Sequence, residues 1–422
     1  MAKIVLNTFG SLGDLHPYLA IAIELKERRH TPLIATSEVY RDKVQAEGIE
    51  FAPVRPDVGP LLNRPELIRK LWHPRKGSEY LLRDFLIPQV EQGFEDLMTA
   101  CAGADLVLTH GVGYAGPIAA EKLGVRWISV ALQPLAFFSA YDPPVIPGAA
   151  PLRHLYRFGP GTFRMFVKVG ERRLINWAKP IADLRRRLGL PDSKWNPILR
   201  DQFSEFGTIA CFSRHFAGPQ PDWPPNVRVT GFIFYDQVGN LPGAPVQNES
   251  ALTALQAFVQ RSEPPVLFTL GSSAVLSPGS FFRESLGAVR KLGVRAVLLA
   301  GPEAQAGLAG SIPDSVFFAS YVPYSEIMPK CAAIVHQGGI GTTAQALRAG
   351  KPMVVVPWSH DQPDNAVRLR RLGVARVTWR ERYRAGRVAR ELAALLNNNG
   401  YRERCRRAIS RLSSVELPFL PH

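Results

Sequence analysis

One stretch in the second half of the chain has the composition of an anion-binding turn. It reads His336-Gln-Gly-Gly-Ile-Gly-Thr-Thr343 and lies between a strand-like segment and a helical pattern. Glycines let backbone N–H groups approach a ligand, and the first turn of a helix attracts negative charge. His336 can donate a hydrogen bond to a phosphate oxygen. A turn that only joins strand to helix has a similar composition. The residues of the predicted phosphate site are His336, Gly338, Gly339, Gly341, Thr342 and Thr343.

A second polar cluster follows the next strand-like segment. Residues 357–365 hold two acidic side chains, a histidine, a glutamine and an asparagine in one short loop. Sugars are recognised by paired hydrogen-bond donors and acceptors, and an Asp-Gln pair supplies both. We therefore predict that Asp361 and Gln362 bind a sugar. Asp364 fits better as a cap of the helix that follows.

In the first half, a glycine-flanked aspartate follows the strand-like segment Lys3–Phe9. Gly10 and Gly13 keep this turn open to a ligand, and Asp14 lies at its rim. A carboxylate in this place can accept a proton from a substrate hydroxyl group. Asp14 also stands where the N-cap of the next helix is expected, and capping would lower its pKa and weaken it as a base. Both roles stay open at this stage.

An aromatic and proline-rich segment, residues 132–166, suits an apolar ligand pocket. We predict that Phe137, Phe138 and Tyr141 line this pocket together with Gly13. The alternative is ordinary core beneath a long loop.

Strands alternating with helices must position these residues. The first half shows strand-like runs such as 106–109 and 127–131 with helical patterns between them, and the second half repeats the rhythm. This rhythm predicts right-handed βαβ units and parallel sheets, an α/β fold of two Rossmann-like doubly wound domains facing across a cleft. In such sheets ligands bind beyond the carboxyl ends of the strands, where the unusual residues fall.

The predicted organisation has four parts. A first domain spans 1–236, and a linker rich in Gly, Pro and Asn spans 237–262. A second domain spans 263–400, and a C-terminal helix spans 401–422.

Taken together, three motifs resemble the donor signature of nucleotide-sugar-dependent glycosyltransferases with two Rossmann domains, the GT-B type. They are His336–Thr343, Ala346–Pro352 and Asp361–Ala366. Similar enzymes are the plant secondary-product, sterol, macrolide and glycopeptide glycosyltransferases, and the order and spacing agree over nearly the whole chain. The likeness is strongest to bacterial rhamnosyltransferases of the rhamnolipid-forming kind.

The resemblance implies a role for each matching residue. His336 and the turn that follows hold the diphosphate, and Asp361 and Gln362 bind the donor sugar. Gly271 and Ser272 meet the diphosphate or the sugar. Tyr321 and Val322 face the nucleobase, although plant relatives carry a tryptophan in place of this tyrosine. Ala344 replaces the ribose-binding glutamate of plant members, so uridine and thymidine both stay open.

The same resemblance implies that Asp14 is the catalytic base, since Gly-Asp-x-x-Pro is the form of this motif in sterol and antibiotic glycosyltransferases. The resemblance also implies that the C-terminal helix of residues 401–422 crosses back onto the first domain, as the last helix does in relatives. His110 ends the strand 106–109, near the place where plant relatives hold an aspartate that orients their catalytic histidine. We infer a catalytic pair in which His110 holds Asp14 ionised and oriented or passes its proton onward. His16 is the alternative partner, and a structural role for His110 is the simpler alternative.

Composition limits the remaining possibilities. The chain has 422 residues, with 46% hydrophobic and 21% charged residues, which is typical of globular proteins. No spanning apolar run and no signal peptide are evident, and the four cysteines lack metal or redox spacing. We predict a cytoplasmic protein with no metal and no cofactor other than the nucleotide-sugar co-substrate.

The net charge of +15 is concentrated in two segments. Residues 151–200 carry twelve Lys and Arg against three acidic residues, and 368–411 carry fourteen Arg against three. Solvated helix faces are the simplest explanation. The first segment, with Phe163, Phe166 and Trp177, is also compatible with peripheral contact to the inner membrane. No aromatic and basic module of a nucleic-acid binder is present.

These observations predict an inverting glycosyltransferase. It moves a hexose, rhamnose or glucose, from a thymidine or uridine diphosphate sugar to a hydroxyl group of an apolar small molecule or lipid. The alternatives are a nucleotide-sugar epimerase of the same fold and a non-catalytic nucleotide-sugar or lipid-binding protein. The oligomeric state does not follow from the sequence.

Overall fold

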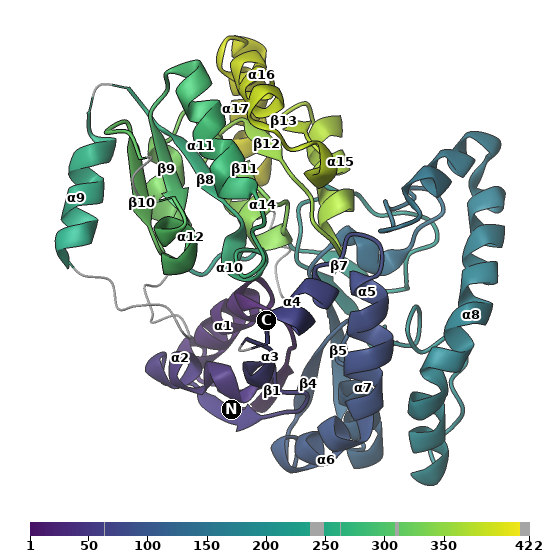
Figure 1. The fold of residues 1–422 in the computed structure, drawn as a ribbon. Coiled ribbons are helices and arrows are strands. Elements are labelled where there is room, and N and C mark those ends of the chain that lie inside the picture. The colour runs from purple at the N-terminus through teal and green to yellow at the C-terminus, as the bar shows by residue number, and fades with distance from the viewer. Residues whose placement is uncertain (63, 237–248, 262, 309–311, 414–422) are drawn as a thin grey trace. The chain divides into compact units, whose positions relative to one another are not determined.

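Short runs of Val, Ile and Leu form two parallel sheets, one in each half of the chain (Figure 1). A computed structural model of the chain describes residues 1–62, 64–236, 249–261, 263–308 and 312–413. The chain divides into two compact units, Met1–Tyr235 and Asp236–His422. Two doubly wound α/β domains are thereby confirmed.

The sheet of the first unit has seven parallel strands in the order β3-β2-β1-β4-β5-β6-β7. The chain adds strands on one side of β1 and then on the other, so the order reverses between β1 and β4. The strands are β1 (Lys3–Asn7), β2 (Thr31–Thr36), β3 (Glu50–Pro53), β4 (Leu106–His110), β5 (Arg126–Ala131), β6 (Thr208–Ala210) and β7 (Val227–Val229).

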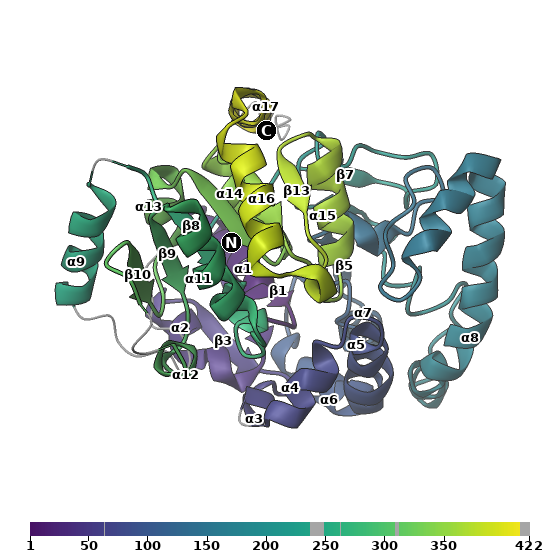
Figure 2. The ribbon, with the colours of Figure 1, turned by 45° about the horizontal axis from the view of Figure 1, so that its top comes forward.

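Right-handed crossovers from β1 in both directions place helices on both faces of this sheet. The long helix α8 runs along the outside of the first unit (Figures 1 and 2). The helical segments are α1 (Leu12–Glu27), η1 (Glu38–Tyr40), α2 (Arg41–Ala46), α3 (Gly59–Leu62), α4 (Pro65–Leu71), α5 (Gly77–Glu79), the π-helix η2 (Tyr80–Leu86), η3 (Ile87–Gln89), α6 (Val90–Ala100), α7 (Ala115–Leu123), η4 (Pro134–Phe137), η5 (Ala150–Phe158) and α8 (Pro160–Arg187).

The second unit repeats the same winding with six parallel strands in the order β10-β9-β8-β11-β12-β13. The order reverses here between β8 and β11. Every residue of β8, β11 and β12 is buried, as both faces of such a sheet are covered. The strands are β8 (Val266–Thr269), β9 (Ala296–Leu299), β10 (Val316–Ala319), β11 (Ala333–His336), β12 (Met353–Val355) and β13 (Ala375–Val377).

Helices of the second unit pack in pairs, with α11 against α16 and α14 against α17. They are α9 (Glu249–Val259), α10 (Gly271–Ala274), α11 (Phe281–Leu292), α12 (Pro302–Ala306), α13 (Tyr324–Ile327), η6 (Met328–Lys330), α14 (Ile340–Arg348), α15 (Gln362–Arg371), η7 (Arg380–Arg382), α16 (Ala385–Leu396) and α17 (Asn399–Ser413).

The unit boundary lies one residue before the predicted end of the first domain. Residues 237–248 and 262 of the predicted linker lie outside the described residues, and so do 414–422. The rest of that segment contains helix α9, so it is not an irregular linker throughout. The cleft between the domains and the return of the C-terminal helix to the first domain stay predictions.

Two further features concern the described residues. None of their helices is both long enough and apolar enough to span a membrane. All four cysteines are buried and unpaired.

Candidate functional site

The point of strand-order reversal in the first unit brings Asp14 and His110 together. Asp14 lies in the first turn of α1, directly after β1, and His110 is the last residue of the neighbouring strand β4. Carboxyl ends of adjacent parallel strands meet at one edge of the sheet. The His110 Nε2 lies 3.8 Å from the Asp14 Oδ1. His110 is buried, and a quarter of the Asp14 side chain is exposed.

Asp14 has a structural task as well, but it is not the N-cap. Helix α1 begins at Leu12, and its N-cap is Ser11. The backbone N–H of Ser11 donates to the Asp14 Oδ2 at 2.8 Å, and the Ser11 hydroxyl accepts from the N–H of Gly13 at 3.2 Å. This reciprocal capping box places Asp14 three residues into the motif. One carboxylate oxygen therefore holds the helix start, and the other faces His110.

Gly10 makes room for this carboxylate. Its φ of +136° is strained for other residues, and a Cβ there would lie 2.2 Å from the Asp14 Oδ2. The hydroxyl of Tyr40 donates to the carbonyl oxygen of Gly10 at 2.9 Å. Gly13 has no such crowding, since the atom nearest to its added Cβ is 3.5 Å away.

His110 is enclosed by apolar and aromatic surroundings. Burial lowers its pKa, and the nearby carboxylate of Asp14 opposes this effect. The ring of Tyr18 lies edge-on at 6.3 Å between centroids. The Nδ1 atom is buried and has no hydrogen-bond partner among the described residues. The alternative partner His16 lies instead against the ring of Tyr235, at 4.8 Å between centroids.

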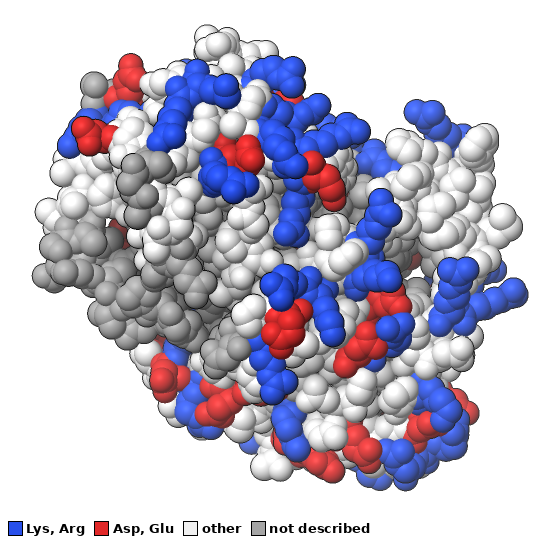
Figure 3. All heavy atoms as spheres, viewed as in Figure 1, with Lys and Arg blue, Asp and Glu red and all other residues white. Residues whose placement is uncertain are grey.

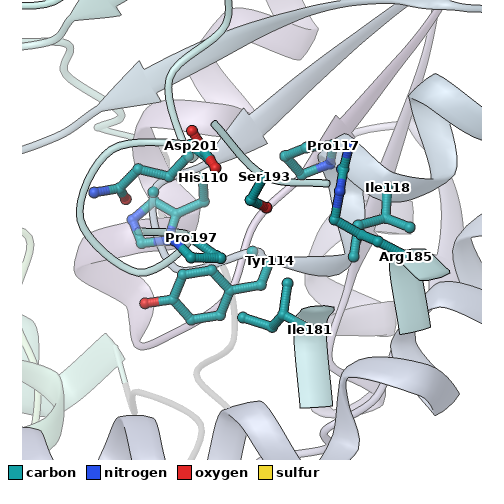
Figure 4. A pocket seen from close by; sticks show the side chains of 12 residues that line it. His110, Tyr114, Pro117, Ile118, Ile181, Arg185, Ser193, Pro197 and Asp201 are labelled. Carbon is teal, nitrogen blue, oxygen red and sulfur yellow. The ribbon is translucent and has the colours of Figure 1, made fainter. Parts of the chain in front are cut away.

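Two pockets flank the end of β4, and Gly113 and Tyr114 line both of them. The first, of about 340 Å³, contains the side chain of His110 together with those of Ser193 and Asp201 (Figure 4). The second, of about 410 Å³, is largely apolar. Its lining residues are Asn7, Thr8, Phe9, Val54, Arg55, Pro56, Leu86, Gln89, Val90, Gly93, Leu97, Val112, Gly113, Tyr114 and Ala115.

The aromatic residues predicted to line an apolar pocket lie elsewhere. Phe137 is buried, and its ring stacks on Trp223 at 4.3 Å and on Phe203 at 5.3 Å between centroids. Phe137 therefore packs in the core, and its role as a wall of the acceptor pocket stays a prediction. Phe138 and Tyr141 are half-buried, and the Tyr141 hydroxyl accepts a hydrogen bond from Arg164 at 3.1 Å. None of these three lines either of the two pockets described above.

In the second unit, His336 ends β11 beside the point of strand-order reversal. It is fully buried, and its Nδ1 accepts a hydrogen bond from the N–H of Gly338 at 3.1 Å. Burial lowers its pKa to about 3. A neutral imidazole that accepts through Nδ1 carries its proton on Nε2. The Nε2 atom is therefore a donor, and it has no partner among the described residues.

The turn after His336 approaches the end of β8 closely. Gly338 has a φ of +89°, and a Cβ there would lie 2.8 Å from Val355. Gly339 is the N-cap of α14, and Gly341, Thr342 and Thr343 form its first turn with Ile340. Gly271 begins α10 after β8, and its added Cβ would lie 2.3 Å from the Gln337 Nε2. Ser272 follows Gly271 in α10.

Residues that the sequence analysis did not select complete this turn. The Gln337 Nε2 donates to the Thr342 hydroxyl at 3.4 Å. The Tyr324 hydroxyl lies 2.8 Å from the Thr269 hydroxyl, which accepts from the N–H of Gly271 at 3.1 Å. The sequence could have indicated Gln337, because it lies inside the glycine motif. Thr269 ends strand β8 and Tyr324 begins helix α13, so both come from distant parts of the chain.

Hydrogen bonds connect the predicted sugar loop, residues 357–365, to the predicted phosphate turn, residues 336–343. The Asn365 Nδ2 donates to the carbonyl oxygen of Gly338 at 2.9 Å and to the Asp361 Oδ2 at 2.6 Å. The Gln362 Oε1 accepts from the N–H of Trp358 at 2.8 Å, so this oxygen already serves the loop. Asp364 has a structural role, because it forms a buried ion pair with Arg368 at 2.7 Å. Its predicted role as the helix cap is wrong, since the N-cap of α15 is Asp361.

Tyr321 and Val322 follow the edge strand β10. Val322 is buried, whereas Tyr321 is half-buried, and burial raises its pKa to about 12. They lie at the same carboxyl edge as the phosphate turn, two strands from β8.

Four buried polar atoms of this region have no hydrogen-bond partner among the described residues. They are His336 Nε2, Gln337 Oε1, Thr343 Oγ1 and Asn365 Oδ1. Buried polar groups are normally paired, so a group of unpaired ones on a single turn indicates the place of a polar ligand. No set of three His, Cys, Asp or Glu side chains suited to a metal occurs in the described residues.

Two protein-family models match this chain. The glycosyltransferase family 28 N-terminal domain matches residues 4–127, and the erythromycin biosynthesis protein CIII-like C-terminal domain matches residues 284–416. The first match contains Asp14 and His110, and the second contains the phosphate turn and the sugar loop.

Curated relatives match over most of the chain. An O-mycaminosyltylonolide 6-deoxyallosyltransferase of Streptomyces fradiae is 31% identical over 389 residues, 88% of this chain and 84% of that relative. A sterol 3-beta-glucosyltransferase of Neurospora crassa is 28% identical over 88% of this chain and 24% of its own length. This chain therefore spans about a quarter of the Neurospora enzyme.

Solved structures share the fold. The glycotransferase of kitacinnamycin matches with a TM-score of 0.70 at 19% identity, over 98% of this chain and 95% of the other. The glycosyltransferase VinC in complex with dTDP matches with a TM-score of 0.66 at 22% identity, over 98% and 96% of the two chains.

The facing arrangement of Asp14 and His110 leads to a testable prediction. The Asp14 carboxylate raises the pKa of His110. Asp14→Asn removes this charge, so the pKa of His110 should fall further. NMR titration of the His110 ring protons measures the change, and the Asp42→Asn variant, altered on the exposed surface, serves as control. An unchanged His110 pKa in Asp14→Asn would mean that the two groups do not face each other in solution.

Proposed function

Since this chain belongs to the nucleotide-sugar-dependent glycosyltransferases of the GT-B fold, we propose how its residues divide the work of sugar transfer. The enzyme moves a sugar from a nucleotide sugar to a small-molecule acceptor. The predicted likeness to sterol and antibiotic glycosyltransferases is confirmed. The special likeness to rhamnolipid-forming enzymes and a rhamnosyl donor stay predictions.

The four unpaired polar atoms around the phosphate turn carry the proposal for the donor site. The Nε2–H of His336 and the N–H groups at the start of α14 bind the diphosphate, with Gly271 and Ser272 opposite them. Asp361 and the amide nitrogen of Gln362 bind the sugar. Tyr321 and Val322 lie against the base of a thymidine or uridine diphosphate hexose, with rhamnose or glucose as the sugar.

In the proposed reaction, the acceptor hydroxyl group attacks the anomeric carbon in line with the departing diphosphate, and the configuration inverts. Asp14 accepts the hydroxyl proton through Oδ1, the oxygen that the capping box does not use. Negative charge grows on the diphosphate as the glycosidic bond breaks. Preorganised donors such as the neutral His336 stabilise that charge in a buried setting.

The largely apolar pocket beside β1 and β4 is the proposed acceptor site. Phe9 enters it directly after β1, five residues before Asp14, and Leu86 enters it from the π-helix η2. π-Helices are rare and often occur at functional sites. This pocket is a different place from the segment around Phe137, which the sequence indicated as the acceptor pocket.

The alternative functions have less support. An epimerase acts on the nucleotide sugar alone and needs no apolar acceptor pocket, and a non-catalytic binder needs no carboxylate that faces a histidine. Both relatives described above are named as transferases.

Two substitutions test this division of work. Asp14→Asn retains an oxygen that can accept from Ser11, so the helix start should stay intact. Because an amide cannot act as the base, the variant should lose transfer but still bind nucleoside diphosphate. His336→Ala should weaken binding and lower kcat by about 10²–10³-fold, the usual effect of losing one such donor. Steady-state kinetics and calorimetric titration with thymidine and uridine diphosphates measure both. Near-normal turnover in Asp14→Asn would restrict that residue to helix capping.

We also propose that turnover needs no divalent metal, because N–H donors and His336 provide the charge stabilisation that a metal would otherwise supply. Activity in the presence of excess EDTA should equal activity with added Mg²⁺. A loss of turnover in EDTA that Mg²⁺ restores would contradict the proposal.

We further propose that the basic segment of residues 151–200 makes peripheral contact with an anionic membrane. The aromatic residues expected to touch the membrane are not exposed: Phe163 is buried, and Phe166 and Trp177 are half-buried. The exposed apolar side chains of η5 and α8 are Tyr156, Phe158, Met165, Val169 and Ile175.

Cations accompany these apolar side chains on the exposed face of α8. Lys168, Arg172 and Arg173 are exposed and have no recorded ion pair among the described residues. Figure 3 shows Lys and Arg side chains among uncharged ones at the outer edge where α8 lies. A second copy of the chain would bring the same positive charge to this face, whereas anionic lipid complements it.

Vesicle sedimentation tests this contact. Replacing Lys168, Arg172 and Arg173 with Gln should lower partitioning onto phosphatidylglycerol vesicles by about 10²-fold, at about 1 kcal/mol for each cation. The same change at Arg382, Arg390 and Arg402, which are exposed in the second unit, is the matched control. Equal loss in both variants, or no binding by the unaltered protein, would remove the proposal.

A further inference from the structure

We propose that His110 carries the proton away from Asp14 and releases it to water in the pocket of about 340 Å³ that His110 lines. The inference rests on the proposed role of Asp14 as the base. It assigns a task to the pocket that His110 lines, which is not the proposed acceptor site, and to a nitrogen atom that the reaction itself does not use.

Asp14 does not need His110 for its orientation. The Asp14 Oδ2 accepts from the Ser11 N–H at 2.8 Å and from the Ser11 hydroxyl at 3.2 Å, and both contacts lie within one helical turn. The Oδ1 faces the His110 Nε2 at 3.8 Å, which is longer than a hydrogen bond. At this distance His110 does not fix the carboxylate. Catalytic hydrogen bonds are often long without substrate and tighten when it binds, so the pair can close to hydrogen-bond distance once Asp14 has received the proton.

The second nitrogen of His110 has the surroundings that such a role requires. His110 is 6% exposed, and its Nδ1 has no hydrogen-bond partner among the described residues. The imidazole lies at the pocket that Ser193, Asp201 and Gln202 also line (Figure 4). These polar side chains can hold a water molecule, and such a water satisfies a buried nitrogen of this kind. The imidazole thus faces the carboxylate through Nε2 and also lines the pocket, and the proposal assigns release of the proton to Nδ1.

The charged and titratable groups around His110 are consistent with this direction of transfer. Asp14 and the ring of Tyr18 face it from α1, and Tyr114 lines the same pocket at the start of α7. Burial raises the pKa of Asp201 across the pocket. The guanidinium group of Arg185 is paired with Glu121 at 2.7 Å, so its charge is compensated.

The step is balanced without a further reactant. The acceptor O–H bond breaks as the oxygen bonds to the anomeric carbon, and Asp14 receives the proton. The proton then moves from Asp14 to the His110 Nε2, while the Nδ1–H bond breaks and a pocket water receives that proton. His110 ends as the other neutral tautomer, and exchange with water resets it: Nδ1 takes a proton from a pocket water and Nε2 gives its proton back to water. Asp14 is ionised again while the product still lies against it.

Chemical rescue tests the relay. His110→Ala leaves a space beside the pocket, and kcat should fall by about 10²-fold, the lower range for a positioned proton-transfer group. Added imidazole should restore kcat in proportion to its neutral fraction, whereas the Kd for nucleoside diphosphate should not change. His110→Gln fills the space but cannot exchange protons between two atoms, so it should remain slow and should not respond to imidazole.

A pocket variant separates the relay from simple packing. Ser193→Leu fills the pocket without touching Asp14, and it should reduce the imidazole rescue of His110→Ala. Asp192→Leu, one residue earlier and not lining the pocket, is the matched control. Full activity in His110→Gln, or a slow His110→Ala without rescue, would make His110 a positioning residue and overturn the relay.

Failure of the underlying proposal is distinguishable from failure of the relay. If Asp14→Asn keeps its turnover, Asp14 is not the base and the relay has no proton to carry. If Asp14→Asn is inactive and His110→Ala has an unaltered kcat and pH profile, the base is correct and only the relay is wrong.

Discussion

The carboxyl ends of parallel strands meet at one edge of a sheet, and the two strands where the order reverses leave an opening between them. Each half of this chain depends on that constraint. In the first unit, β1 and β4 place Asp14 at 3.8 Å from His110. In the second unit, β8 and β11 place Gly271 close to Gln337 and the phosphate turn. The residues of each pair are far apart in the sequence, and only the winding of the sheet makes them neighbours.

Each opening contains a buried imidazole with one nitrogen unpaired among the described residues. Leaving a polar atom buried without a partner costs free energy, which a ligand or water can offset. His336 is fixed as a neutral donor by the N–H of Gly338, which suits the stabilisation of a leaving diphosphate. His110 has no such local bond and faces a carboxylate instead, which suits proton transfer. In the proposed reaction the same kind of side chain therefore has two different tasks, which depend on the partners of its two ring nitrogens.

Much of this arrangement could be predicted from local sequence patterns. The strand-like runs 106–109 and 127–131 were predicted to within one residue of β4 and β5 at each end, because short continuous apolar runs are typical of buried parallel strands. Asp14 was predicted to be the N-cap itself. The Ser-x-x-Asp spacing that starts at Ser11 instead signals a capping box, in which Ser11 is the N-cap. The sequence alone could not decide whether Phe137 belongs to the core or to a pocket wall, because aromatic side chains are common in both. The apolar pocket combines Phe9, Leu86 and Tyr114 from separate elements, and no local pattern reports such a combination.

The central claim is that the turn after β11 binds a diphosphate through a neutral His336. A crystal structure with bound thymidine or uridine diphosphate tests it most directly. The account predicts a phosphate oxygen within hydrogen-bond distance of the His336 Nε2 and of backbone N–H groups in the first turn of α14. A nucleotide bound elsewhere, with the His336 Nε2 still unpaired, would contradict it.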